Sequence, residues 1–299
     1  MKKIIVYSLL SLSIVMSQKT LADDVSIETY RGPSIVEIGA KKMAVLDIAA
    51  VDTLNSLGVD IAGIPSPHYV AYLDELAGNA DNVGSLFEPD FEKLANMDLD
   101  LIVAGGRSSR QYDQLSKIAP TIDMTIWGEN HLEQVMSRLS AYGAILDVEE
   151  KANTVASDFL AKIETAKAAV SDKGNALIIM ANGPKVSAFG KGSRFGWLHD
   201  ALELPEAVPN VDEQTHGEVI SFEFIANADP DWLLVIDRAA AIGQNGETAS
   251  ETLNNALVTN TKAWKNGNVI YLNSANVYIA GGGIQAMQQT LDQVIAAFN

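Results

Sequence analysis

The chain has 299 residues, no cysteine and a formal net charge of −17 at pH 7, with 21 basic and 38 acidic side chains. This acidity disfavours nucleic acid and anionic membrane surfaces as partners. The lack of cysteine excludes disulfides, which a chain of this size does not need in order to bury a core.

The N-terminal segment has the pattern of a secretory signal. Lys2 and Lys3 precede an apolar run, Ile4 to Met16, and a small-residue site follows at Thr20-Leu21-Ala22. About thirteen apolar residues are too few for a membrane span, which needs roughly 20. We expect a signal peptide at residues 1–22 and cleavage after Ala22. With no cysteine to carry a lipid, we expect a soluble, monomeric protein free in the periplasm.

Short apolar runs bounded by turns alternate with helical patterns along the rest of the chain. The predicted strands are Lys42–Asp47, Asp60–Ile64 and Leu99–Ala104 in the first half, and Ala176–Met180, Trp232–Asp237 and Asn268–Leu272 in the second. Alternation of strand and helix predicts the α/β class with largely parallel sheets. Runs such as LIVA and LLVI are apolar on both faces, which indicates sheets covered by helices on both sides.

A long helical pattern, Asp147 to Gly174, separates the two halves. Its apolar stripe recurs at helical spacing, and Gly174 is a candidate C-cap. A helix of this length is a rod of roughly 36 Å. We therefore predict two Rossmann-like lobes, residues 23–146 and 174–299, joined by one stiff helix over residues 147–173.

One motif occurs twice. FEKLANMDLDLIVAGGR, Phe91 to Arg107, returns as FEFIANADPDWLLVIDR, Phe222 to Arg238. The repeat predicts two similar lobes that face each other across a cleft. Both closing arginines follow a predicted strand, and ligands of α/β sheets bind beyond the carboxyl ends of strands.

A third arginine, Arg194, lies in the glycine-rich turn of GKGSRFGWLHD, before a helical pattern. Any one of the three arginines, taken alone, is more simply a surface residue. The pairing of Arg107 with Arg238 in so acidic a chain favours a shared anionic ligand instead.

Two further residues lie where they could reach the same cleft. His216 is in the polar stretch NVDEQTHGEVIS, and Tyr278 is in NSANVYIAGGG, just before the terminal helical pattern. Taken singly, such a histidine is usually solvated and such a tyrosine usually packs. The four histidines lack zinc-site spacing, and we expect His199 to be structural.

The motifs of enzymes are weak or missing. FGKGSRFG departs from the G-x-G-x-x-G spacing of dinucleotide sites, and neither G-x-S-x-G nor H-E-x-x-H occurs. AGGGI, Ala280 to Ile284, could cradle a phosphate or simply open the last helix. No pattern brings a nucleophile together with its base.

From about residue 30 onward, the chain resembles the class III (cluster A) periplasmic binding proteins of iron-siderophore ABC importers, in their catecholate branch. The likeness rests on ADPDWLLV and, more specifically, on the contexts of five residues in order. It implies that Arg107, Arg194 and Arg238 bind the siderophore and that His216 and Tyr278 ligate iron. It also implies that Glu92 and Glu223 dock onto the permease. Several relatives are lipoproteins, unlike the form expected here.

The resemblance implies a binding protein, not an enzyme, that delivers a ferric catecholate siderophore to an inner-membrane permease with its ATPase. Fe(III) would be cargo, with no intrinsic cofactor. A bis-catecholate leaves two of six iron positions for His216 and Tyr278, whereas a tris-catecholate leaves none and would be held by charge alone. The first lobe has no matching pair, so we expect iron to be held from the second lobe. Alternatives are a haem, cobalamin or hydroxamate-siderophore binder of the same fold, or a siderophore-processing enzyme.

Overall fold

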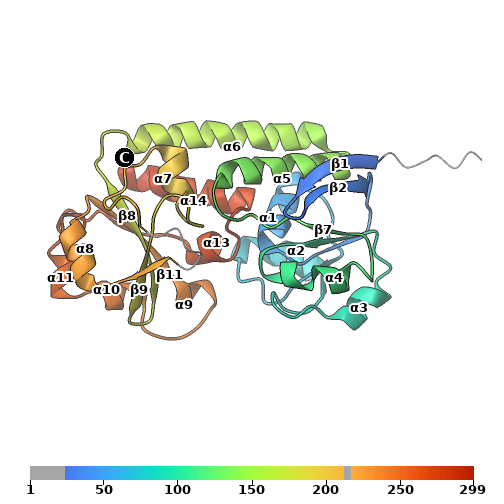
Figure 1. Cartoon of the computed structure of the whole chain (residues 1–299), viewed down its shortest axis with the longest axis horizontal. Helices are drawn as coiled ribbons and strands as arrows, with labels where there is room; N and C mark the ends of the chain where they lie inside the picture. Colours follow the sequence, from blue (N-terminus) through green and yellow to red (C-terminus); the bar gives the residue numbers. More distant parts are fainter. Residues whose placement is uncertain (1–23, 212–216) are drawn as a thin grey trace, which may run out of the picture.

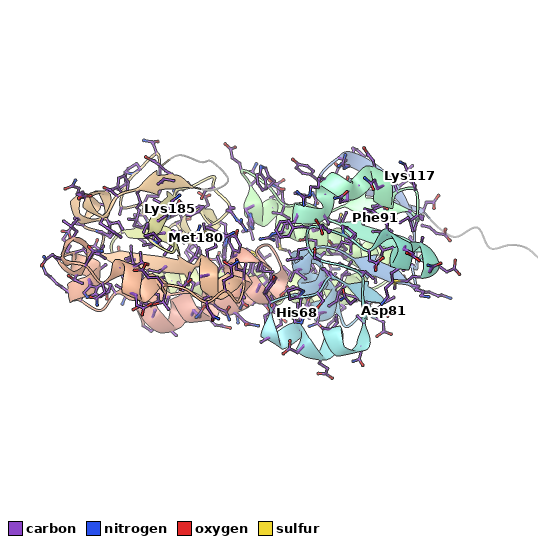
Figure 2. The ribbon with its side chains drawn as sticks, turned by 90° about the horizontal axis from the view of Figure 1, so that it is seen from below. His68, Asp81, Phe91, Lys117, Met180 and Lys185 are labelled. Atoms are coloured by element: carbon purple, nitrogen blue, oxygen red, sulfur yellow. The ribbon has the colours of Figure 1, made fainter. Side chains whose placement is uncertain are left out.

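The computed structural model describes residues 24–211 and 217–299, which form two lobes side by side (Figure 1). Each lobe is built on its own five-stranded sheet, and the long helix α6, Glu149–Val170, runs along both of them. Seen from below in Figure 2, His68 and Phe91 belong to the first lobe and Met180 and Lys185 to the second. The predicted two-lobed α/β architecture is confirmed.

The sheet of the first lobe has the strand order β5-β4-β3-β6-β7 and is parallel throughout. Its three predicted strands are present. The bounds are β3 Met43–Val45, β4 Gly63–Ile64, β5 Asp81–Asn82, β6 Leu101–Ala104 and β7 Thr121–Asp123. All residues of β3 and β6 are buried, as expected for strands with helices on both faces.

The helices of the first lobe are α1 Ile48–Leu57, α2 Asp74–Asn79, α3 Phe91–Asn96, α4 Tyr112–Leu115 and α5 His131–Ile145, with 3₁₀ turns η1 Ala71–Leu73 and η2 Gly106–Gln111. An antiparallel hairpin precedes them, made of β1 Asp24–Thr29 and β2 Gly32–Glu37. This hairpin was not among the strands that the sequence pattern predicted. It lies beside α5, outside both main sheets.

The sheet of the second lobe has the order β10-β9-β8-β11-β12 and is mixed. β8, β11 and β12 are parallel, whereas β9 is antiparallel to both of its neighbours. The bounds are β8 Ala176–Asn182, β9 Lys185–Phe189, β10 Glu218–Ile220, β11 Trp232–Asp237 and β12 Val269–Tyr271. Its helices are α7 Trp197–Leu202, α8 Phe222–Ala228, α9 Arg238–Ala241, α10 Ala249–Leu253, α11 Ala256–Thr259, α12 Lys262–Lys265, α13 Ser274–Tyr278 and α14 Ile284–Phe298.

Helix α6 buries the predicted stripe. Phe159, Ile163, Ala166 and Val170 are all buried, and α6 packs against α5 of the first lobe and α14 of the second. The predicted cap is wrong, because the helix ends at Val170 and Gly174 lies in the following turn with φ +98°. Within the described residues, no helix combines the length and the apolar character that crossing a membrane requires.

The two copies of the repeat occupy equivalent places. Helix α3 leads into β6 and helix α8 leads into β11, and each of these strands is fourth in the order of its sheet. Each helix is capped by the residue before it, Asp90 or Ser221, whose side chain accepts from the backbone N–H three residues on. The repeat therefore delivers an arginine to the same edge of both sheets.

The terminal helix α14 ties the lobes together. Asp52 of α1 is fully buried and accepts from the backbone N–H groups of Gln285 at 2.8 Å and Ala286 at 2.9 Å. A Cβ on Gly283 would lie 2.6 Å from the Asp52 carboxyl carbon. The run Ala280–Ile284 thus opens a helix whose N-terminus already holds the chain's own carboxylate, which leaves no place for a phosphate.

Candidate ligand-binding site

A cavity of about 390 Å³ lies between the lobes. Residues of the first lobe on its wall include Asp47, Phe87, Arg107, Trp127 and His131. The second lobe contributes Arg194, Arg238 and, from the segment around Tyr278, residues 277–279 and Gly281. A hollow of this size, bounded by apolar and cationic groups from two lobes, suits a small anionic molecule.

The three predicted arginines converge on one tyrosine. The backbone carbonyl of Tyr278 accepts from Nη2 of Arg107 at 3.2 Å and from Nη2 of Arg194 at 2.9 Å. Nε of Arg238 donates to the phenol oxygen of the same residue at 3.3 Å. The three guanidinium carbons lie 5.3, 4.8 and 5.8 Å from the centre of its ring. The structure thus brings together four of the five residues that the sequence singled out for ligand binding.

The turn η2, which follows β6, positions Arg107. The backbone N–H of Gly106 donates to the hydroxyl of Thr125 at 2.9 Å, and that hydroxyl donates to Asp123 at 2.6 Å. The other carboxylate oxygen of Asp123 accepts from the hydroxyl of Ser109 at 2.6 Å. Because Asp123 is buried at the end of β7, this network fixes the turn to the edge of the sheet.

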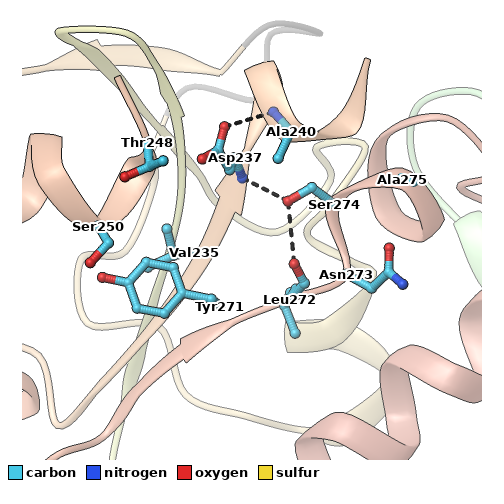
Figure 3. A pocket seen from close by; sticks show the side chains of 10 residues that line it. All are labelled: Val235, Asp237, Ala240, Thr248, Ser250, Tyr271, Leu272, Asn273, Ser274 and Ala275. Atoms are coloured by element: carbon cyan, nitrogen blue, oxygen red, sulfur yellow. Dashed lines mark hydrogen bonds between the residues drawn. The ribbon is translucent and has the colours of Figure 1, made fainter. Parts of the chain in front are cut away.

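Arg238 and Tyr278 are positioned by hydrogen bonds at the ends of β11 and β12. Figure 3 shows Asp237, Leu272 and Ser274, which make these bonds. Asp237 caps α9 by accepting from the N–H of Ala240 at 3.0 Å, so that Arg238 begins that helix. The backbone N–H of Asp237 donates to the hydroxyl of Ser274 at 2.8 Å, which in turn donates to the carbonyl of Leu272. Since Ser274 begins α13 and Tyr278 ends it, this contact sets the ring relative to Arg238.

Arg194 is held by a tight glycine turn. The hydroxyl of Ser193 donates to the carbonyl of Gly190 at 2.6 Å, and a Cβ on Gly196 would lie 2.1 Å from that same carbonyl oxygen. The glycines therefore serve the close folding of the turn on itself and not a nucleotide. The turn places the Arg194 guanidinium 4.6 Å from the ring centre of Phe195 as well as beside Tyr278.

The site concentrates positive charge. Burial and the charge of Arg107 lower the pKa of Arg194 to about 10, although Tyr278 partly opposes this. Within the described residues, no carboxylate forms an ion pair with any of the three arginines. An anion that enters the cavity would therefore relieve the repulsion between like charges.

The same charges act on the phenol. Burial raises the pKa of Tyr278, but the hydrogen bond from Arg238 and the charges of all three arginines outweigh it and lower the pKa below its ordinary value. The pKa of Asp47, which lies beneath the turn that carries Arg107, shifts in the opposite direction. Burial raises its pKa to about 6, although the charge of Arg107 opposes this rise. The arginines thus make the Tyr278 phenol easier to ionise than an ordinary tyrosine.

The histidines divide into three cases. His216 lies outside the described residues, so its place relative to Tyr278 stays a prediction. His199 is buried, with Nδ1 2.9 Å from the carbonyl oxygen of Leu204, which confirms its structural role. His131 lines the cavity from the first lobe, and sequence reasoning missed it because a lone histidine carries no spacing signal. In the described part of the chain, no three His, Asp or Glu side chains gather as a metal site.

Other hollows lack these features. One of about 730 Å³ lies along β2 and the N-terminal ends of β6 and β7, and no arginine lines it. A second, of about 330 Å³, is the one drawn in Figure 3. Its side chains include Asp237, Tyr271 and Ser274, with no basic group among them. Of these three hollows among the described residues, the interlobe cavity alone is lined by clustered positive charge.

Comparison with known proteins identifies the family. The periplasmic binding protein family matches residues 43–275, most of both lobes. This chain belongs to that family. Members of this family bind solutes. The family therefore supports a binding protein over the alternative of an enzyme.

Two curated relatives are similar over most of their length. This family member is 41% identical over 262 residues to the petrobactin-binding protein YclQ of Bacillus subtilis, covering 85% of this chain and 81% of the relative. It is 30% identical over 285 residues to the ferric-anguibactin-binding protein FatB of Vibrio anguillarum, covering 93% and 88%.

Solved structures agree with the fold. The crystal structure of YclQ superposes with a TM-score of 0.88 at 36% identity, covering 93% of this chain and 99% of the other. The periplasmic catecholate-siderophore binding protein VctP of Vibrio cholerae superposes with a TM-score of 0.84 at 31% identity, covering 92% and 100%. The predicted class III periplasmic binding protein fold is confirmed.

Proposed function

We propose that this chain is the substrate-binding protein of an ABC importer and that it captures ferric catecholate siderophores in the periplasm. Three relatives described above are named for binding petrobactin, ferric anguibactin or catecholate siderophores. Their names support the ligand class, and the site of this chain supplies the chemistry. Fe(III) is the cargo and not a resident cofactor.

The observation that carries this proposal is the convergence of Arg107, Arg194 and Arg238 on Tyr278. Two catecholates contribute four negative charges to one Fe(III), so the complex is anionic. Guanidinium groups stay protonated and donate several hydrogen bonds, which makes them suited to catecholate oxygens. The three groups surround a cavity of suitable size in a chain that is otherwise strongly acidic.

Iron coordination follows from the phenol. A lowered pKa makes the Tyr278 phenolate available as a hard oxygen donor for Fe(III). We propose that Tyr278 and His216 complete the iron shell of a tetradentate bis-catecholate. A hexadentate tris-catecholate has no open position, so the arginines would hold it by charge and hydrogen bonds alone.

Delivery involves the repeated glutamates. Glu92 and Glu223 lie in the first turns of α3 and α8, and both side chains are exposed. We propose that they dock onto basic residues of an inner-membrane permease that works with an ATPase. We propose further that residues 1–22 are a cleaved signal, that lobes 23–146 and 174–299 flank the connecting helix 147–173, and that the mature protein is a monomer without a lipid anchor.

A binding titration tests the ligand class. The purified protein is titrated with the Fe(III) complex of a linear bis-catecholamide, with a ferric trihydroxamate, with haem and with cobalamin, and tryptophan fluorescence is followed. Trp127 lines the cavity and is 48% exposed, which makes it a suitable reporter. We expect saturable one-to-one binding of the catecholate complex only. Preferential binding of any other compound would replace the proposal with the corresponding alternative.

A further inference from the structure

His131 has a buried polar atom without a partner. It is the first residue of α5, and its ring borders the interlobe cavity. Within the described residues, Nε2 is shielded from solvent and makes no hydrogen bond. Burying an unsatisfied polar atom of this kind is unfavourable, so such atoms are rare in native proteins.

The residue that faces Nε2 from the second lobe is small. The residue opposite is Gly282, and a Cβ there would lie 3.8 Å from Nε2 and only 2.8 Å from Cδ1 of Ile126. Gly282 has φ +94°, a conformation that favours glycine. A larger residue at this position would crowd the space next to the imidazole.

The imidazole is also kept neutral. Burial, together with the charge of Arg194, lowers the pKa of His131 to about 4. A neutral ring can carry its proton on Nε2 and donate it to an oxygen acceptor. Ile126, which also packs against Gly282, is apolar and offers Nε2 no hydrogen-bond partner.

We propose that His131 is a ligand-contacting residue of the first lobe, whose Nε2 donates a hydrogen bond to an oxygen of the bound chelate. This inference rests on the proposed function. It adds a neutral donor to the charged arginines that line the cavity. The first lobe then contacts the chelate through His131 as well as Arg107, whereas the iron itself is still bound from the second lobe.

Two substitutions separate this role from a structural one. His131→Phe keeps a flat ring but cannot form a hydrogen bond, whereas His131→Gln places an amide N–H near the position of Nε2. The probe is the Fe(III) complex of a linear bis-catecholamide. We expect His131→Phe to weaken its binding about tenfold and His131→Gln to restore most of the loss. His68→Phe is the control, because His68 contacts Asp74 and Val70 and does not line the cavity, so this variant should bind with unchanged affinity.

Thermal unfolding of each ligand-free variant accompanies the titrations. The midpoint of His131→Phe should equal or exceed that of the wild type, because the substitution removes an unpaired buried atom. Equal affinities for wild type and a folded His131→Phe would overturn the inference while leaving the proposed function intact. So would a Gln variant that binds no better than the Phe variant. Failure of the wild type to bind the chelate would instead overturn the proposed function.

Discussion

Nε of Arg238 donates to the phenol oxygen of Tyr278 at 3.3 Å, across the ends of two neighbouring strands. Arg238 comes from the second copy of a sequence repeat, whereas Tyr278 ends a helix 40 residues later. The bond joins the group that supplies positive charge to the group proposed to bind iron. It therefore determines how readily the phenol ionises.

Removal of this bond should raise the pKa of Tyr278. Arg238→Met takes away both the hydrogen bond and the charge that offset the effect of burial. The measurement is an ultraviolet titration of phenolate absorbance. Because the chain has eight tyrosines, Tyr278→Phe is subtracted from the wild type, and the double variant from Arg238→Met. A Tyr278 pKa that stays the same or falls in Arg238→Met would contradict this coupling.

Arg107 and Arg110 form a matched pair for testing the arginine cluster. Both guanidinium groups lie near the ring of Phe87, at 5.9 and 5.6 Å, but only Arg107 lines the cavity and bonds to Tyr278. Arg107→Gln should weaken binding of the ferric bis-catecholate complex by about tenfold or more, through loss of a charge-assisted hydrogen bond. Arg110→Gln should bind like the wild type in the same titration. Equal losses in both variants would mean that only general charge matters.

The contact between α1 and α14 should make stability depend on pH. Burial raises the pKa of Asp52 to about 7 from 3.8, despite the hydrogen bonds that it accepts from Tyr72, Gln285 and Ala286. Between these values the folded protein binds more protons than the unfolded chain. The free energy of unfolding should therefore fall as pH rises from about 4 to about 7, with a slope of at most about 1.4 kcal/mol per pH unit from this group.

The variant Asp52→Asn removes the titrating carboxyl group and is compared with the wild type. Urea unfolding at a series of pH values should give a flatter profile for the variant, even if it is less stable at every pH. Asp47, whose pKa burial raises to about 6, titrates in both proteins and cancels in the difference. Identical slopes for wild type and variant would show that Asp52 stays charged in the folded protein throughout.

Gly283 should be intolerant of any side chain. A Cβ there would lie 2.6 Å from the Asp52 carboxyl carbon, so Gly283→Ala must push apart the cap of α14. We expect a loss of about 1–3 kcal/mol in the free energy of unfolding. Gly246→Ala is the control, because a Cβ at that exposed glycine meets nothing within 4 Å and should change stability by no more than about 0.5 kcal/mol. Comparable losses in the two variants would rule out the clash as the cause.

The features that the sequence predicted were local or repeated. The apolar runs predicted β6 and β11, and the repeat predicted that Arg107 and Arg238 would follow equivalent strands, because period and order are visible along the chain. The stripe of α6 was predicted for the same reason.

The features that were missed depend on distant contacts. The hydrogen bond from Gln285 to Asp52 spans 233 residues. The sequence around AGGGI therefore could not indicate that a carboxylate already occupies the N-terminus of the helix that follows. His131 likewise becomes a candidate only because it lies beside Gly282 of the other lobe, a contact that no sequence period predicts. The prediction of a Gly174 cap was wrong because the helix ends at Val170, where Ser171 is extended. Gly174 lies in the turn that follows.

The most direct test of the central claim is a crystal structure of the protein with the Fe(III) complex of a linear bis-catecholamide, with iron located by its anomalous scattering. We expect a single iron in the interlobe cavity, bound by the Tyr278 phenolate, with catecholate oxygens contacting Arg107, Arg194 and Arg238. Iron located elsewhere, such as in the hollow along β2, or a chelate that makes no contact with the three arginines, would contradict the account.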